Sequence, residues 1–208
     1  VFNGVIFNYP LIKKNLEQKG HTFKSTGDTE VIIRSYMEYG SKCVKHLDGV
    51  FAFCIYDIEK KTIFLARDRI GIKPLYYLKE NDQIYFSSHM KGITKNMKTK
   101  EIDPVALNYQ FTLHSVVPAP YTIIKNVKKL DPGCTMTITK TGVLNKERYF
   151  NINDIQLSDY SNDEINENIS SILTSAIKKR INIADVPVGI LLSGGLDSSL
   201  ITAISREY

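Results

Sequence analysis

The sequence contains no tryptophan, and its few cysteines, Cys43, Cys54 and Cys134, lie far apart. An odd, widely spaced set matches neither a disulfide framework nor the spacing of zinc ligands, and it favours a reducing compartment such as the cytoplasm. There is no apolar run of about 18 residues and no basic stretch leading into a short apolar one, so neither a membrane-spanning helix nor a signal peptide is predicted. Although the net charge is +5, no basic run is interleaved with aromatic residues, so nucleic acid is not an expected partner.

What remains is the composition of a globular protein. The 208 residues are 43% hydrophobic and 24% charged, which predicts one domain, or one and part of a second. The chain opens at Val1 with an apolar run and closes at Tyr208 within a helical pattern without a glycine or proline stop. We expect an internal piece of a longer chain, with a processed or trimmed protein as the alternative.

The first 150 residues alternate between helical and strand patterns. Helices are predicted at 11–19, 28–39 and 104–113, with Asp28 and Asp103 as N-caps. Aromatic-rich apolar runs predict an opening strand at 1–7 and three hairpins, at 51–56 with 62–66, 75–78 with 84–87, and 134–139 with 143–150.

The composition changes after residue 150. Residues 151–164 are polar and acidic and are predicted to be a linker. Apolar residues then recur at steps of three and four from Ile165 to Ile181, which predicts an amphipathic helix. Residues 186–192 are wholly apolar, as in a strand buried on both faces of a parallel sheet, and a further helical pattern ends the chain.

Between that apolar run and the last helix lies the heptapeptide SGGLDSS, residues 193–199. A helix N-terminus presents unpaired N–H groups and a positive dipole end, and adjacent glycines let an anion approach the backbone closely. The serines add hydroxyl donors, while Asp197 could cap the loop or hold Mg²⁺ between itself and the phosphates. The alternative is a plain glycine turn between a strand and a helix.

This heptapeptide resembles the SGGxDS pyrophosphate loop of the N-type ATP pyrophosphatases, which split ATP between its α and β phosphates and adenylate an oxygen. The resemblance implies that ATP binds at the loop, and that Mg²⁺ accompanies the phosphates although no metal-ligand set is visible. The expected ATP-binding residues are Leu192, Ser193, Gly194, Gly195, Leu196, Asp197, Ser198 and Ser199.

Several collinear segments, most of them within the first 150 residues, share a second resemblance. They read FNGVIFN at 2–8, GDTEVI at 27–32, GVFAF at 49–53 and ARDRIGIKPLYY at 66–77, with VPAP at 117–120 and DVPVG at 185–189 further on. Together they resemble the glutamine-hydrolysing asparagine synthetases. In combination with the heptapeptide, they select this family among the ATP pyrophosphatases.

The resemblance assigns roles in glutamine hydrolysis. The Asn3 amide and the Gly4 N–H would form the oxyanion hole, and Asp28 would bind the α-ammonium of glutamine. Val5 stands at a substrate-contacting position where the family has glutamate. Taken singly, Asn3-Gly4 could be a type I′ turn and Asp28 a simple helix cap.

Two features depart from the family or leave a role open. The family's nucleophile is an N-terminal cysteine, and none of the three cysteines is N-terminal, so we expect the nucleophile to lie upstream of Val1. Arg67, Asp68 and Lys73 form a charged group at the end of a hairpin; we expect Arg67 and Asp68 to be a structural pair, although this stretch could also line a passage for ammonia.

The predicted fold is α+β followed by α/β. Residues 1–150 would form an N-terminal-nucleophile hydrolase four-layer sandwich that lacks its first segment. Residues 165–208 would form the opening helix, strand and phosphate loop of a doubly wound α/β domain.

The resemblance implies a cytoplasmic enzyme that transfers the amide nitrogen of glutamine to aspartate through an acyl-adenylate, with glutamine, aspartate and ATP as partners and a homodimer as a possible assembly. One alternative is a relative that activates another carboxylate, such as a cyclase. The other is a degenerate, non-catalytic glutaminase-like scaffold, which Val5 favours.

Overall fold

The computed structural model describes residues 1–81, 83–95, 97–155 and 159–208, and it divides the chain into two compact units. The first unit is Val1–Ile152 and the second is Asn153–Tyr208. Residues 156–158 of the expected linker lie outside the described residues.

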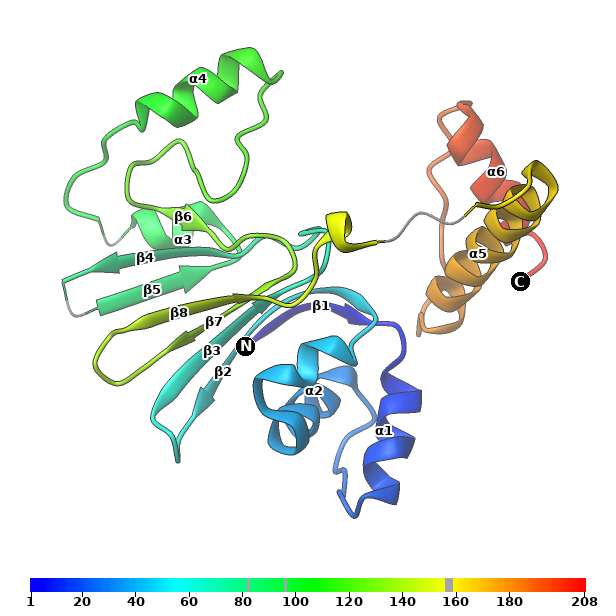
Figure 1. The fold of residues 1–208 in the computed structure, drawn as a ribbon, viewed down its shortest axis with the longest axis horizontal. Coiled ribbons are helices and arrows are strands. Elements are labelled where there is room, and N and C mark those ends of the chain that lie inside the picture. Colours follow the sequence, from blue (N-terminus) through cyan, green and yellow to red (C-terminus); the bar gives the residue numbers. More distant parts are fainter. Residues whose placement is uncertain (82, 96, 156–158) are drawn as a thin grey trace. The chain divides into compact units, whose positions relative to one another are not determined.

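A five-stranded antiparallel sheet forms the centre of the first unit (Figure 1). Its strands, in spatial order, are β1 (Phe2–Ile6), β2 (Gly49–Asp57), β3 (Thr62–Arg67), β7 (Cys134–Ile138) and β8 (Leu144–Arg148). The predicted hairpins β2–β3 and β7–β8 are both confirmed. Because β1 comes first in this order, it is an edge strand, and one side of its backbone is not paired within the sheet.

A smaller antiparallel sheet has the order β5-β4-β6. Strands β4 (Tyr76–Glu80) and β5 (Gln83–Ser87) are the predicted second hairpin. The short β6 (Lys128–Lys129) was not predicted, because two lysines carry no strand signal and are paired only through the tertiary structure.

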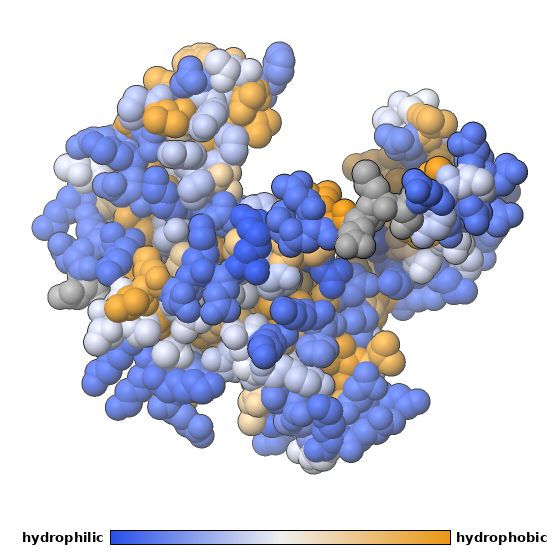
Figure 2. Space-filling model, viewed as in Figure 1, coloured by the Kyte–Doolittle hydropathy of each residue, from blue (hydrophilic) through white to orange (hydrophobic). Residues whose placement is uncertain are grey.

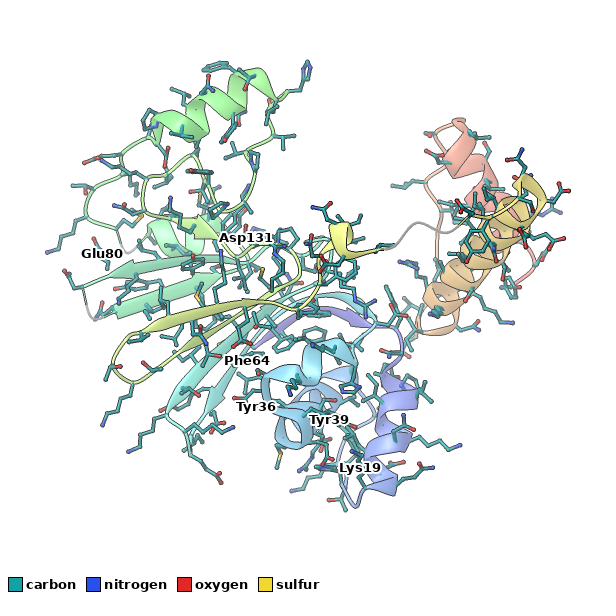
Figure 3. All side chains as sticks on the ribbon, in the orientation of Figure 1. Lys19, Tyr36, Tyr39, Phe64, Glu80 and Asp131 are labelled. Atoms are coloured by element: carbon teal, nitrogen blue, oxygen red, sulfur yellow. The ribbon has the colours of Figure 1, made fainter. Side chains whose placement is uncertain are left out.

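Two helices cover one face of the larger sheet. They are α1 (Tyr9–Gln18) and α2 (Asp28–Tyr39), followed by a 3₁₀ turn at Gly40–Lys45. Figure 3 shows Tyr36 of α2 facing Phe64 of β3, and their ring centroids lie 5.1 Å apart. The core of this layer is made of apolar side chains from both helices and the sheet, including Ile6, Leu16, Val31, Ile32, Phe51, Phe53 and Phe64.

The opposite face of the larger sheet packs on the smaller sheet. Successive residues of a strand point to opposite faces, so Phe51 and Phe53 face the helices while Ala52 and Cys54 face the second sheet. The buried residues between the sheets include Leu65, Leu75, Leu130, Cys134, Met136 and Ile138.

A helical layer covers the outer face of the smaller sheet. Ile93 of α3 (Met90–Thr94) packs with Leu78 of β4 and with Val127. Farther along the chain, α4 (Pro104–Thr112) begins at the predicted cap, where Asp103 accepts bonds from the N–H groups of Val105 and Ala106 at 3.0 and 3.2 Å. The first unit therefore has the expected order of layers: helices, sheet, sheet, helix.

Hydrophilic residues gather over the visible surface of this sandwich, with smaller apolar patches between them (Figure 2). This distribution agrees with the core assignment, since the largest fully buried side chains are apolar residues of the strands and helices.

The second unit consists mainly of two helices, α5 (Asn162–Asn182) and α6 (Leu196–Ser205). A capping box starts α5, in which Ser161 and Glu164 each bond the other's backbone N–H. The strand expected at 186–192 is wrong: these residues have no regular structure, and Leu191 is 96% exposed. A strand needs a neighbour to pair with, and the described part of this unit supplies none.

Candidate functional site

The unpaired edge of β1 is the first feature of the candidate site. Val1 and Cys54 exchange two backbone bonds of 2.9 Å, so they form a hydrogen-bonded pair of the ladder. Pairs of this type recur every second residue, and Asn3 is therefore bonded to Ala52. The residues that alternate with these, including Gly4, direct their N–H groups away from β2, towards the open edge of the sheet.

Gly4 occupies a position that only glycine can fill. Its φ is +151°, and a Cβ there would lie 2.7 Å from the Cα of Phe51 and still closer to the Val50 carbonyl oxygen. The residue lies within β1 and pairs with Phe51, so the alternative that Asn3-Gly4 forms a type I′ turn is wrong. The close approach of two backbones holds the outward N–H of Gly4 in place.

Asp28 lies on the same edge of β1. Its Oδ2 accepts the outward N–H of Ile6 at 3.1 Å, two residues beyond Gly4. Neighbouring outward N–H groups on a strand are about 6.6–6.8 Å apart. The expectation that Asp28 caps the helix is wrong, because the N-cap is Gly27 and Asp28 is the first residue of α2, where its carboxylate reaches the strand instead.

The side chains of Asn3 and Val5 point to the face between the two sheets. Asn3 lines a pocket of about 290 Å³, and Val5 is 38% exposed. The sequence did not indicate the rest of the pocket wall, since strands far apart in sequence supply it. The wall consists of Val1, Ala52, Phe53, Cys54, Leu75, Phe86, Ser87 and Ser88.

The three cysteines are buried and chemically unsuited to attack a substrate. Burial raises the pKa of the Cys43 thiol to about 12 and that of Cys54 to about 11, and it also raises the pKa of Cys134. The thiolate is the nucleophilic form, so these shifts disfavour reactivity near neutral pH. This agrees with the expectation that none of them is the nucleophile.

Arg67 and Asp68 bind the backbone, and not each other through their charged groups. The Arg67 guanidinium donates to the carbonyls of Lys73, Leu130 and Gly71 at 2.6–2.8 Å, and desolvation on burial lowers its pKa. Asp68 is only 1% exposed and accepts backbone N–H groups. The expected structural role of these two side chains is confirmed, whereas the pairing of one with the other is not seen.

The glycine loop of the second unit is built from local contacts. Gly195 is the N-cap of α6, and the Ser193 and Ser198 hydroxyl oxygens lie 3.0 Å apart. Asp197 is exposed and makes no cap bond. The expectation that it caps the loop is therefore wrong, and the expectation that it holds Mg²⁺ stays a prediction. Gly194 has φ +82° and open space around it. Open space at Gly194 thus lies next to the N-terminus of α6 and the exposed Ser193 and Ser199, an arrangement that fits a phosphate chain.

Neither a membrane-spanning helix nor a cluster of metal-ligand side chains is found among the described residues. No helix there combines the length and apolar character needed to cross a bilayer. The same residues contain no group of three or more His, Cys, Asp or Glu side chains placed to hold a metal ion.

Two family models match the chain, and the boundary between them lies close to the boundary between the two units. The sequence model of the glutamine amidotransferase domain matches residues 1–150, and that of asparagine synthase matches residues 168–208. Asparagine synthetase [glutamine-hydrolyzing] 3 of Bacillus subtilis is 38% identical over the whole chain, which covers 34% of that protein. A putative asparagine synthetase 2 of Methanocaldococcus jannaschii is 39% identical, and the chain covers 40% of it. The chain thus spans about a third of the length of the curated relatives.

Solved structures share the fold. Glutamine phosphoribosylpyrophosphate amidotransferase of B. subtilis, complexed with ADP and GMP, aligns with all of the chain and 43% of its own, at a TM-score of 0.50 and 18% identity. The allosteric regulatory enzyme of purine biosynthesis aligns with 98% of the chain at a TM-score of 0.51. These matches support the N-terminal-nucleophile type of fold for the first unit.

Proposed function

Since the chain belongs to the family of glutamine amidotransferase domains, we propose that its first unit supplies the oxyanion donors and the substrate carboxylate of a glutaminase site. One observation carries this proposal. The N–H of Gly4 points out of the edge of β1 that pairs with no other strand, and the Asp28 carboxylate binds the N–H of Ile6, two residues farther along the same edge. A substrate with a carbonyl to polarise and an ammonium to bind matches that pair.

The roles follow from the chemistry of amide hydrolysis. When a nucleophile attacks the glutamine side-chain carbonyl, negative charge develops on its oxygen, and preorganised donors stabilise that charge. Gly4 offers a rigid backbone donor and Asn3 a side-chain amide in the adjoining pocket. An ionised carboxylate has about four acceptor positions, so Asp28 can bind an ammonium while it keeps the Ile6 N–H. We place the nucleophile in a cysteine outside these 208 residues.

The second unit would bind the ATP substrate. Gly194, Gly195 and the first N–H groups of α6 would hold the phosphates, with Ser193, Ser198 and Ser199 as hydroxyl donors. Mg²⁺ would partly neutralise the phosphate charge, and the exposed Asp197 carboxylate is the oxygen ligand that the loop offers. A doubly wound α/β fold for this part of the parent protein belongs to the same proposal.

For the parent protein we propose synthesis of asparagine. ATP would activate the aspartate side-chain carboxylate as an acyl-adenylate with release of pyrophosphate, and ammonia from glutamine would displace AMP. The printed names of the relatives and the order of the two family matches support this assignment. A reducing, cytoplasmic setting fits the three free thiols, and a homodimer can be checked by analytical ultracentrifugation.

An isotope experiment tests the proposal. The full-length protein is supplied with aspartate, ATP, Mg²⁺ and glutamine labelled with ¹⁵N at the side-chain amide. We expect the label in the side-chain amide of asparagine, together with one pyrophosphate for each asparagine. In the Asp28→Asn variant the KM for glutamine should rise, while synthesis from free ammonia should remain.

Other outcomes distinguish the rival functions. Pyrophosphate release that requires a carboxylate other than aspartate would identify a related cyclase or amidotransferase. Synthesis from ammonia with no glutamate release from glutamine would identify a degenerate glutaminase domain, which is the alternative favoured by Val5.

A further inference from the structure

Asp68 is a buried carboxylate surrounded by backbone donors. It is 1% exposed and accepts five backbone N–H bonds. Its Oδ1 takes the N–H groups of Ile70, Gly71 and Ile72 at 2.6–3.2 Å, and its Oδ2 takes those of Phe51 and Lys73 at 3.2 and 2.9 Å. Four of these donors belong to the loop that follows Asp68. The fifth, Phe51, lies in β2, so this contact ties the loop to the neighbouring strand.

The contact to Phe51 replaces a ladder bond. Arg67 pairs with Ala52 in the β2–β3 register, so Asp68 stands opposite Phe51. The N–H of Asp68 donates to the Phe51 carbonyl at 2.8 Å, as an antiparallel ladder requires. The return bond, from the N–H of Phe51, goes to the side chain of Asp68 at 3.2 Å. A side chain therefore helps to fix the position of the β2 backbone at this point.

On its other side, Phe51 meets the oxyanion donor of the proposed site. Gly4 pairs with Phe51 in the β1–β2 register, and the space between them is too small for a methyl group. A displacement of Phe51 would therefore move Gly4 or open a gap beneath it. Arg67 further stabilises the loop after Asp68, because it donates to two carbonyl groups of that loop, whose N–H groups bind Asp68.

We propose that Asp68 is a positioning residue for glutamine hydrolysis, which acts through Phe51 to hold the Gly4 N–H where the oxyanion forms. This rests on the proposed glutaminase function of the first unit. Asp68 lies behind β2 and touches no substrate in this role. Loss of Asp68 should mainly destabilise the transition state, because a displaced oxyanion donor lowers kcat more than it weakens binding of the ground-state amide.

The Asp68→Asn variant tests the contacts of Oδ2, of which the one to Phe51 reaches β2. Its amide has one acceptor oxygen, and the arrangement with most bonds directs that oxygen towards the three donors of Oδ1. The amide nitrogen then faces the N–H groups of Phe51 and Lys73, and both of those bonds are lost. Removal of a whole oxyanion donor costs about 10²–10³ in kcat. For a displaced donor we expect a loss of about 10–100-fold in kcat for glutamate release, with KM changed less than about threefold.

Asp103→Ala, which removes the cap of α4, is the matched control. Asp103 is also buried and also accepts backbone N–H bonds, but at the start of α4, away from the β1–β2 pair. Thermal unfolding of the full-length protein should show a loss of stability in both variants, whereas only Asp68→Asn should lose kcat. Pyrophosphate release with ammonia should be the same in both. If Asp68→Asn does not fold, Asp68→Glu replaces it, since it keeps both oxygens and displaces them by one methylene.

The outcomes separate the two proposals. A folded Asp68 variant with the kcat of Asp103→Ala, or one that raises KM alone, would overturn the positioning role and leave the glutaminase function standing. A parent protein that releases no glutamate from glutamine would overturn the proposed function itself, and the positioning role with it.

Discussion

Gly4 in the first unit and Gly194 in the second both have positive φ, of +151° and +82°, but their surroundings differ. A Cβ on Gly4 would collide with the backbone of β2, whereas a Cβ on Gly194 would meet nothing within 4 Å. Gly4 is thus required by the packing of two strands. Gly194 is required by its own backbone conformation and, as we propose, by the phosphates that would fill the open space.

The same difference extends to the residues around each glycine. Asp28 and Asp68 reach partners 22 and 17 residues away in sequence. Around the glycine loop, Ser193 and Ser198 bond within five residues. The first site therefore depends on the whole sandwich, and the second on a short loop and one helix.

The largest effect should come from Gly4→Ala. The new methyl group would collide with the backbone of β2, which cannot move away because β3 pairs with its other side. We therefore expect a loss of roughly 4 kcal/mol or more of unfolding free energy, in the range of exceptional single mutations. Urea unfolding and glutamate release measure it in the full-length protein. The control is Gly20→Ala, at φ +92° with open space, where strain alone costs about 1–3 kcal/mol. Equal losses in the two variants would contradict the packing argument.

The next largest effect should come from Gly194→Val. Because no atom of a residue beyond its two chain neighbours lies within 4 Å of the new Cβ, stability should fall only by the strain of a positive φ, about 1–3 kcal/mol. Pyrophosphate release with ammonia as nitrogen source should nevertheless be lost, because the side chain occupies space expected for a phosphate oxygen. Glutamine hydrolysis should persist. Pyrophosphate release at the parent's rate would show that the loop is not the ATP site.

Asp197→Ala separates function from stability within the same loop. The carboxylate is exposed and makes no cap bond, so its removal should change the unfolding free energy by no more than about 0.5 kcal/mol. If the carboxylate holds Mg²⁺ against the phosphates, pyrophosphate release should still be lost, and glutaminase should be retained. A partial loss that excess Mg²⁺ does not change would argue against the metal role.

The same difference between local and long-range contacts decided which features were predictable from sequence. The range 28–39 of α2 and the Asp103 cap were predicted correctly, because both depend on signals within a few residues. The partners of Asp28 and Asp68 were not predictable, since strand register brings Ile6 and Phe51 to them. The strand expected at 186–192 was wrong for a related reason: an apolar run becomes a strand only where another strand pairs with it.

A smaller change is expected from Val5→Glu in the full-length protein. Val5 lies beside Gly4 and is partly exposed, so a carboxylate there could bind the charged part of glutamine. A charge-assisted hydrogen bond contributes about 1.5–3 kcal/mol, which corresponds to a KM lowered roughly 10–100-fold. Val5→Gln has nearly the same size without the charge and should lower KM less. An unchanged or raised KM would place this position away from the amino acid.

The smallest effect concerns a local contact of the first unit, at the loop that leads into α2. The Glu30 carboxylate accepts the Ser25 hydroxyl at 2.8 Å and the N–H groups of Lys24 and Ser25, and these bonds lower its pKa to about 2. Since the folded-state pKa lies below the ordinary value of 4.5, the stabilisation is present above pH 4.5 and is lost as the pH falls towards 2. Thermal unfolding of Glu30→Gln should therefore show a weaker pH dependence in this window than the parent.

Ser25→Ala is the matched control for this contact. It removes the hydroxyl donor, the largest cause of the shift, while leaving the carboxylate and its backbone donors in place. The pKa of Glu30 should then lie closer to 4.5, so the loss of stability should begin at the same pH, near 4.5, but should be smaller and be complete at a higher pH than in the parent. Parallel curves for the parent, Glu30→Gln and Ser25→Ala would mean that the entry to α2, and with it Asp28, is held by the sandwich alone. Divergent curves would show that this site also depends on a short local contact, as the glycine loop does.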